Sequence, residues 1–148
     1  MYDISAIGVS VRLLAHITMP AGFTITEFAS DADPFDFPEM TIAEAEMNVN
    51  GDLVTFSAPT PLLVTLNVIP DSDADRNLSV IFEANRAGKN KFHARDIITL
   101  VGSYPDGSSV TLSEGKMLAG VPAKSPATGG RIKSKAYSFA FQNLARTR

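Results

Sequence analysis

The chain has 148 residues, no cysteine and two histidines. This length predicts one domain over residues 1–148, and the composition argues against a structural zinc or iron–sulfur site. The formal net charge of −3 argues against a protein that is basic throughout. No apolar run of roughly 18 residues and no basic leader occur in the sequence, so we expect a soluble protein made inside the cell, without signal peptide or membrane insertion.

The first part of the chain predicts two strands. Apolar and polar residues alternate over residues 7–19, which is typical of one long strand buried on a single face. Residues 20–22, Pro-Ala-Gly, predict a turn, and residues 23–28 predict the returning strand. A strand this long suits a barrel or a sheet that extends across subunits.

A loop with two prolines follows at residues 29–38. It contains Phe35 and Phe37, two large apolar side chains that need burial. We expect both of them to pack against a second copy of the chain.

Residues 41–49 and 53–56 predict a β-hairpin. Asn50-Gly51 between them favours a two-residue type I′ turn, in which both residues have positive φ. Glu44 and Glu46 fall on one face of the first strand because side chains alternate across a strand.

An apolar strand at residues 62–69 leads into the one helix that the sequence predicts, at residues 72–88. Ser72 is suited to the N-cap, and Asp75 to the capping box. The helix must dock on a sheet through a narrow apolar stripe, which contains Leu78, Ile81 and Phe82.

The remaining residues return to strand patterns. Residues 96–104 and 109–118 predict a hairpin with a Pro-Asp-Gly turn, and residues 132–143 predict a last strand after a loop at 120–130. The last strand carries Tyr137, Phe139 and Phe141 on one face. In total we expect a mainly β domain of seven or eight strands with one flanking helix.

No pattern for catalysis or cofactor binding is present. The sequence lacks a phosphate-binding loop and a Ser-His-acid signature, and His16 and His93 are best interpreted as solvated or hydrogen-bonded side chains. We therefore expect neither an enzyme nor a cofactor. Two other classes of protein stay open, a small-ligand-binding barrel and a nucleic-acid-binding module. The nucleic-acid-binding module would use Phe92 and Tyr137 to stack on bases and a basic patch to bind the backbone. The residues of this patch would be Lys89, Lys91, Arg95, Arg131, Lys133 and Lys135.

The order of elements resembles the tail tube protein of contractile-tailed bacteriophages. The resemblance covers nearly the whole chain and is carried by four stretches, which are DPFDFPEMTIAEAEMNVNGDLVTFS, LLVTLNVIPDSDADRNLSVIFEANRAG, IITLVGSYPDGSSVTLSEGKMLAG and KAYSFAFQNL. The type VI secretion tube protein has a similar fold and is the nearest alternative.

The resemblance implies a β-barrel or sandwich whose copies form hexameric rings. These rings would stack into a hollow tube in the virion tail, assembled in the host cytoplasm. The implied partners are the tail sheath protein, the tape-measure protein and the baseplate hub, and DNA would pass through without specific binding. No residue motif defines the family, so the resemblance assigns no site residues.

The charges are distributed unevenly along the chain. Residues 13–75 contain eleven acidic residues and no lysine or arginine, whereas residues 76–148 contain twelve basic and four acidic ones. This is either chance drift of the surface composition or a pair of opposite surfaces that meet between copies, with Lys133 and Lys135 on the basic side. For Glu44 and Glu46 we expect the lumen of the tube, where carboxylates repel phosphates; a solvated outer face is the alternative.

Overall fold

The computed structural model of the chain describes residues 7–30, 33–126 and 128–147. The expectation of no N-terminal leader falls largely on residues 1–6, which lie outside this description. The strands and the helix are β1 (Ser10–Ala15), β2 (Met19–Ile25), β3 (Phe35–Asp36), β4 (Ala43–Met47), β5 (Leu53–Ser57), β6 (Leu62–Val68), α1 (Asp73–Asn85), β7 (Ile98–Ser103), β8 (Ser109–Ala119) and β9 (Lys135–Thr147).

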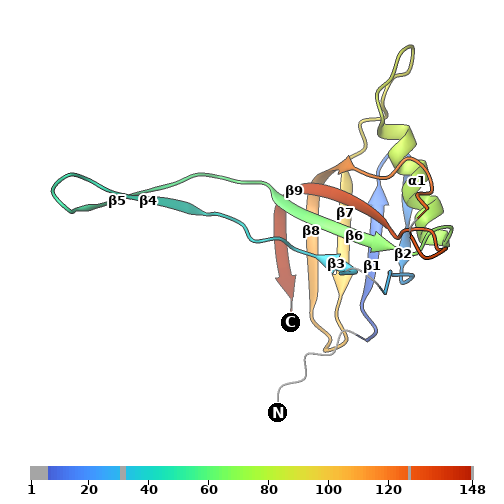
Figure 1. The fold of residues 1–148 in the computed structure, drawn as a ribbon, viewed down its shortest axis with the longest axis horizontal. Helices are drawn as coiled ribbons and strands as arrows, with labels where there is room; N and C mark the ends of the chain where they lie inside the picture. Colours follow the sequence, from blue (N-terminus) through green and yellow to red (C-terminus); the bar gives the residue numbers. More distant parts are fainter. Residues whose placement is uncertain (1–6, 31–32, 127, 148) are drawn as a thin grey trace.

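Seven strands form one antiparallel sheet, in the order β2-β1-β7-β8-β9-β6-β3, and β4 and β5 form a separate hairpin that projects away from it (Figure 1). The expectation of a mainly β domain with one helix is confirmed. The sheet is not closed into a barrel, because β2 and β3 are its two edges. After β2 the chain crosses to β6 on the far side, where Phe28 forms an isolated bridge with Val68.

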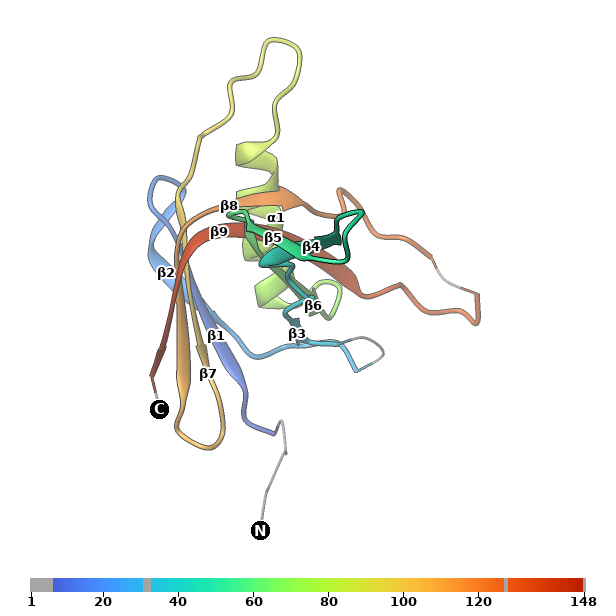
Figure 2. The ribbon, with the colours of Figure 1, turned by 90° about the vertical axis from the view of Figure 1, so that its left-hand side faces the viewer.

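The core lies where α1 packs on the curved sheet. The longest strands, β8 and β9, bend over so that they contribute to both walls of the fold (Figure 2). Leu78 and Ile81 of α1 are fully buried in one core cluster with strand residues such as Leu100 and Phe139, and Phe82 is partly buried against this cluster. The expected apolar stripe of the helix therefore faces the sheet.

The helix begins where its sequence signals predict. Ser72 is the N-cap, and its hydroxyl accepts a hydrogen bond from the Asp75 amide at 3.2 Å. The Asp75 carboxylate reaches back to the Asp71 amide at 2.8 Å. At the other end the helix stops at Asn85, before the predicted residue 88, and the Lys91 amine donates to the carbonyls of the last turn.

The prediction of one long strand over residues 7–19 is wrong. The chain turns at residues 16–18 because the carboxylate of Asp96 accepts hydrogen bonds from the amides of Ile17 at 3.0 Å and Thr18 at 2.9 Å, and from the Thr18 hydroxyl. A carboxylate almost 80 residues away in the chain thus closes a tight hairpin between β1 and β2.

The predicted turn at residues 20–22 is also wrong, since these residues lie inside β2. Pro20 is tolerated there because β2 is an edge strand, where a missing amide donor costs no ladder hydrogen bond. Gly22 has φ +74°, and a Cβ on it would lie 2.7 Å from the Leu14 side chain, so the position requires glycine.

The predicted hairpin between β4 and β5 is present, but its turn is longer than predicted. The loop runs from Asn48 to Asp52, and the Asn48 side chain oxygen accepts from the amides of Asn50 at 3.0 Å and Asp52 at 2.9 Å. Of the Asn50-Gly51 pair only Gly51 has positive φ, at +85°. A side chain hydrogen bond has therefore replaced the two-residue turn.

Candidate functional site

The most unusual feature of the molecule is the segment at residues 37–61, which we call the arm. It carries β4 and β5 far from the sheet (Figure 1), and every residue of both strands is exposed. A two-stranded hairpin without other packing is marginally stable in water. An arm of this kind is typical of a segment that packs on another molecule.

The register of the hairpin gives the arm two different faces. Ala43, Ala45 and Met47 pair with Ser57, Thr55 and Leu53, and these six residues form the uncharged face. The other pairs are Glu44 with Phe56 and Glu46 with Val54, and they form the acidic face. Directly opposed residues share one side of an antiparallel pair, so each face is continuous.

Large apolar side chains on the arm lie in water. Met47 and Leu53 are each 64% exposed, next to each other on the uncharged face, and Val49 at the tip is fully exposed. Neighbouring exposed apolar residues of this kind mark an interaction surface. The uncharged face of the arm is therefore the first candidate for a contact with a partner.

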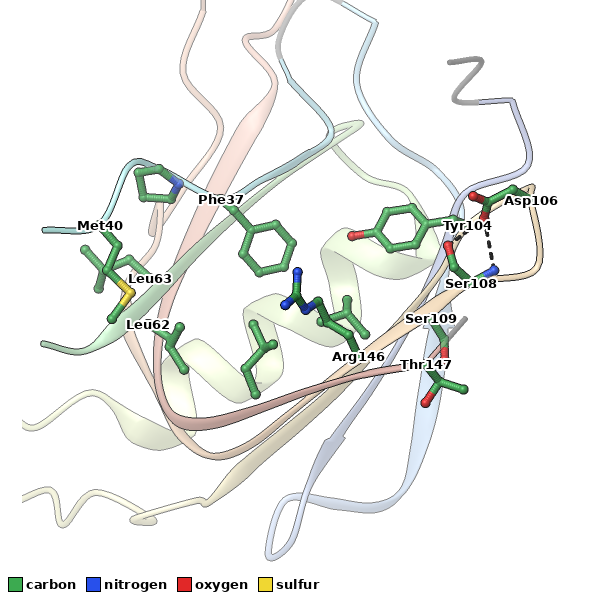
Figure 3. Close-up of a pocket in the computed structure, with 13 residues that line it drawn as sticks. Phe37, Met40, Leu62, Leu63, Tyr104, Asp106, Ser108, Ser109, Arg146 and Thr147 are labelled. Atoms are coloured by element: carbon green, nitrogen blue, oxygen red, sulfur yellow. Dashed lines mark hydrogen bonds between the residues drawn. The ribbon is translucent and has the colours of Figure 1, made fainter. Parts of the chain in front are cut away.

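A groove of 760 Å³ lies at the root of the arm. Its apolar walls come from the arm, from β6 and from the end of β9, with Phe37, Met40, Leu62 and Leu144 among them. Figure 3 shows Phe37 and Arg146 pointing into the same space, with Tyr104 and Asp106 farther along.

The polar end of the groove is ordered by hydrogen bonds. The Asp106 carboxylate accepts from the Ser108 amide at 2.9 Å and from the Ser108 hydroxyl at 2.5 Å. Burial, followed by the negative charge of Asp106, raises the pKa of the Tyr104 phenol. The phenol therefore stays neutral at ordinary pH, and the negative charge at this end belongs to Asp106.

Phe35 and Phe37, which the sequence predicts at a contact between copies, have different positions. Phe35 lies in β3, partly buried against the core, and its ring packs edge-on to Phe37 at 4.8 Å and to Tyr104 at 6.4 Å between centroids. Gly102 makes room for it, since a Cβ there would lie 3.1 Å from the Phe35 ring. Phe35 thus packs mainly against its own chain, whereas Phe37 is 37% exposed in the groove.

Lys135, also predicted at such a contact, lies in the interior. It is 6% exposed, and its amine lies 3.3 Å from the Asp75 carboxylate. The Tyr137 hydroxyl donates to the same carboxylate at 2.8 Å and is 2.9 Å from the Ser79 hydroxyl. Burial is the main cause that raises the pKa of Tyr137. Lys135 therefore joins β9 to α1 and is not offered to a partner, while Lys133 two residues earlier is exposed.

Many of the basic residues in the second half of the chain lie in two loops. One follows α1 at residues 86–97 and projects beyond the helix end (Figure 1), and the other joins β8 to β9 (Figure 2). In the second loop Lys124 forms an ion pair with Asp71, and the hydrogen bond from Lys124 lowers the pKa of that carboxyl group. Exposed basic residues in the two loops include Lys89, Arg95, Arg131 and Lys133.

The described part of the chain offers no cluster of three His, Cys, Asp or Glu residues that could hold a metal ion. His16 has a structural contact, because its Nδ1 accepts a hydrogen bond from the Ile97 amide at 2.8 Å. No helix within the described residues is long and apolar enough to cross a membrane.

Comparisons with known proteins gave a family match and several structures of the same fold. The family model described as tail fiber protein gp32 matches residues 2–145. A search of curated proteins gave no match.

Three solved structures share the fold over nearly the whole chain. The sheath/tube terminator of an extracellular contractile injection system has 12% identity and a TM-score of 0.60, covering 100% of this chain and 99% of that one. The sheath–tube complex of the same system has 12% identity and a TM-score of 0.58, with coverages of 99% and 92%. The tube-terminating cap of the anti-feeding prophage has 13% identity and a TM-score of 0.54, with the same coverages.

Proposed function

The chain belongs to the tail fiber protein gp32 family, and on this premise we propose that it is a structural, non-enzymatic subunit of a contractile tail. Its copies assemble into rings that stack around a channel. The tail sheath and the baseplate hub are the surrounding partners, and DNA and the tape-measure protein pass through the channel without specific binding. The subunit is then part of the virion tail, assembled in the host cytoplasm.

The arm is the observation that carries this proposal. Its uncharged face exposes Met47 and Leu53 and has no packing of its own. In the proposed assembly this face lies on the sheet of a second copy. Burial there removes apolar area from water at about 25 cal/mol per Å², which stabilises both the arm and the assembly.

The acidic face then lies on the opposite side of the arm, and we assign it to the channel. Repeated around a ring, Glu44 and Glu46 give the channel a negative wall that repels phosphates, so that DNA slides. A basic wall would hold DNA through the release of counterions.

The burial of two residues argues against the alternative function, a nucleic-acid-binding module. Tyr137, its second stacking aromatic residue, is fully buried, and Lys135 of its basic patch is paired inside the fold. A base cannot stack on a ring without solvent access.

Two matched variants test the use of the arm. Ala45→Glu adds a charge to the uncharged face, and Val54→Glu adds the same charge to the acidic face. We expect Ala45→Glu to remain a folded monomer in size-exclusion chromatography with light scattering, and Val54→Glu to form rings. Equal assembly of both variants would contradict a contact through the uncharged face.

The double variant Glu44→Lys/Glu46→Lys tests whether these two residues line the channel. Tubes of this variant should retain added single-stranded DNA with an affinity that falls steeply as salt rises, whereas wild-type tubes should not retain it. If the variant tubes bind no more DNA than the wild type does, the two glutamates do not line the channel.

A further inference from the structure

The loop at residues 86–97, which we call the basic loop, presents an aromatic ring to solvent. Phe92 is 99% exposed. The loop is nevertheless ordered by hydrogen bonds, because the Lys91 amide donates to the Gly88 carbonyl at 3.1 Å and the Ala94 amide to the Ala84 carbonyl at 2.9 Å. The Lys91 amine donates to the carbonyls of Glu83 and Arg86 at the helix end. The fold thus directs Phe92 outward.

The backbone of the basic loop also departs from the usual conformation. Asn90 and Arg95, on either side of Phe92, both have φ +58°. Residues other than glycine adopt such angles at an energetic cost, and they do so where the surrounding contacts require it. Lys89 and Arg95, three residues before and three residues after Phe92, are both exposed.

The groove at the root of the arm is complementary to this loop. Its walls are mainly apolar, from Phe37, Leu62 and Leu144, and the groove is partly open to solvent. Asp106 lines one end, and Glu39 is exposed next to the groove residue Pro38, so the rim carries negative charge. Arg146 also lines the groove, and its guanidinium can contact the face of an aromatic ring.

The basic loop and the groove lie at different ends of the molecule. In Figure 1 the loop extends beyond the end of α1, whereas the groove elements are the root of the arm, the β7–β8 turn and the end of β9. A contact between them must therefore join two copies. Such a contact is heterologous, and it can repeat from copy to copy without limit.

We propose that Phe92 of one copy inserts into the groove of the next copy along the tube, with Lys89 and Arg95 facing the rim that contains Glu39 and Asp106. This inference rests on the proposed tube function, and it assigns the contact between successive rings. The arm contact within a ring is separate from it.

The absence of cysteine from the sequence allows a direct test by disulfide trapping. The double variant Phe92→Cys/Leu63→Cys places one thiol in the loop and one in the groove wall, and a bond forms only when the Cβ atoms come within about 4.5 Å. After mild oxidation of assembled protein, a non-reducing gel should show a ladder of multimers that collapses with reductant. The matched control Phe92→Cys/Val80→Cys, with its second thiol on the exposed face of α1, should show no ladder.

The outcomes separate this inference from the proposed function. Tubes without a ladder would overturn the loop contact and leave the tube intact, whereas absence of rings in the wild type would overturn both. A ladder from Val49→Cys/Leu63→Cys, with none from Phe92→Cys/Leu63→Cys, would assign the groove to the arm tip and contradict the proposal.

Replacing the Phe92 side chain by alanine measures how much the loop–groove contact contributes to stacking. Phe92→Ala should raise the protein concentration needed for stacking by at least tenfold, because each copy in a ring loses an aromatic anchor worth about 1.4 kcal/mol, while single rings still form. Val80→Ala should leave that concentration unchanged. Equal stacking of Phe92→Ala and wild type would contradict the proposal.

Discussion

At the scale of single residues, Asp96 joins the β1–β2 turn, which is almost 80 residues away in the chain, to the end of α1. Its carboxylate accepts hydrogen bonds from Ile17 and Thr18 in the β1–β2 turn and from the Asn85 side chain at 2.8 Å at the end of α1. Burial alone would raise the pKa of Asp96, but the hydrogen bonds to the carboxylate outweigh it and hold the pKa below its usual value. The ionised form is therefore the one that the fold selects.

The lowered pKa of Asp96 predicts how its contribution to the stability of the fold changes with pH. A lowered pKa contributes stability above the pKa of the unfolded chain, about 3.9, and that contribution is lost as pH falls through the lower folded-state value. Asp96→Asn should cost roughly 1–3 kcal/mol at pH 7, because it removes charged hydrogen bonds. Urea unfolding of the wild type and of Asp96→Asn, near neutral pH and below about pH 3, should show that the difference between their free energies of unfolding becomes smaller in acid. A difference that does not change with pH would contradict this explanation.

Asp75 offers a second prediction with a control in the same helical turn. Its ion pair with Lys135 is buried, so Asp75→Ala leaves an unpaired cation inside the fold and should cost about 3–5 kcal/mol. Asp73 pairs with Arg76 at 3.7 Å on the surface, and Asp73→Ala should cost about 1 kcal/mol or less. Similar losses in urea unfolding for the two variants would show that the buried pair has no special role.

The contacts of Asp75 show what cannot be predicted from the sequence. Asp75 was predicted as a capping residue, and it is one, but its partners Lys135 and Tyr137 lie about 60 residues away. Neither a charge pattern nor periodicity reveals such pairs. For the same reason Lys135 was predicted at a surface that it does not reach.

At the scale of elements, local signals predict structure well where local contacts decide it. The α1 start at Ser72 and the β7–β8 turn, in which the Gly107 amide donates to the Tyr104 carbonyl at 3.1 Å, both follow from short motifs. The long strand over residues 7–19 was wrong because Asp96 imposes a turn from a distance. The faces of the arm needed the observed register, since pairing decides which side chains share a face.

The pairing of β8 and β9 gives an element-level prediction. Gly115 in β8 lies opposite Phe141 in β9, and a Cβ on Gly115 would be 2.2 Å from the Phe141 ring. Gly115→Ala should therefore destabilise the fold by about 1–3 kcal/mol through overpacking. Gly88→Ala, whose Cβ would meet its nearest atom at 3.6 Å, is the control and should be nearly neutral. Equal melting temperatures of the two variants would mean that the ring moves aside freely.

At the scale of the whole molecule, the charge asymmetry of the sequence becomes a spatial one. The acidic half contributes the arm, with Glu39, Glu44, Glu46 and Asp52, and the basic half contributes the two loops. Opposite charges at the rim of an interface mainly raise the rate of encounter and set the register, while apolar burial supplies most of the stability.

Salt should therefore act on the rate of assembly more than on finished tubes. At 1 M salt the screening length falls to about 3 Å, so light scattering should show slower assembly, while preformed tubes persist. Lys133→Glu, which changes an exposed basic residue, should slow assembly at low salt and have little effect at high salt. An assembly rate that responds to neither change would show that the asymmetry is drift in surface composition.

Negative-stain electron microscopy of the purified wild-type protein shows whether the chain assembles by itself around a channel. With rising protein concentration we expect rings with a central hole and stacks of these rings in tubes of one constant width. A protein that remains monomeric in light scattering at every concentration, with no rings on the grid, would contradict the account.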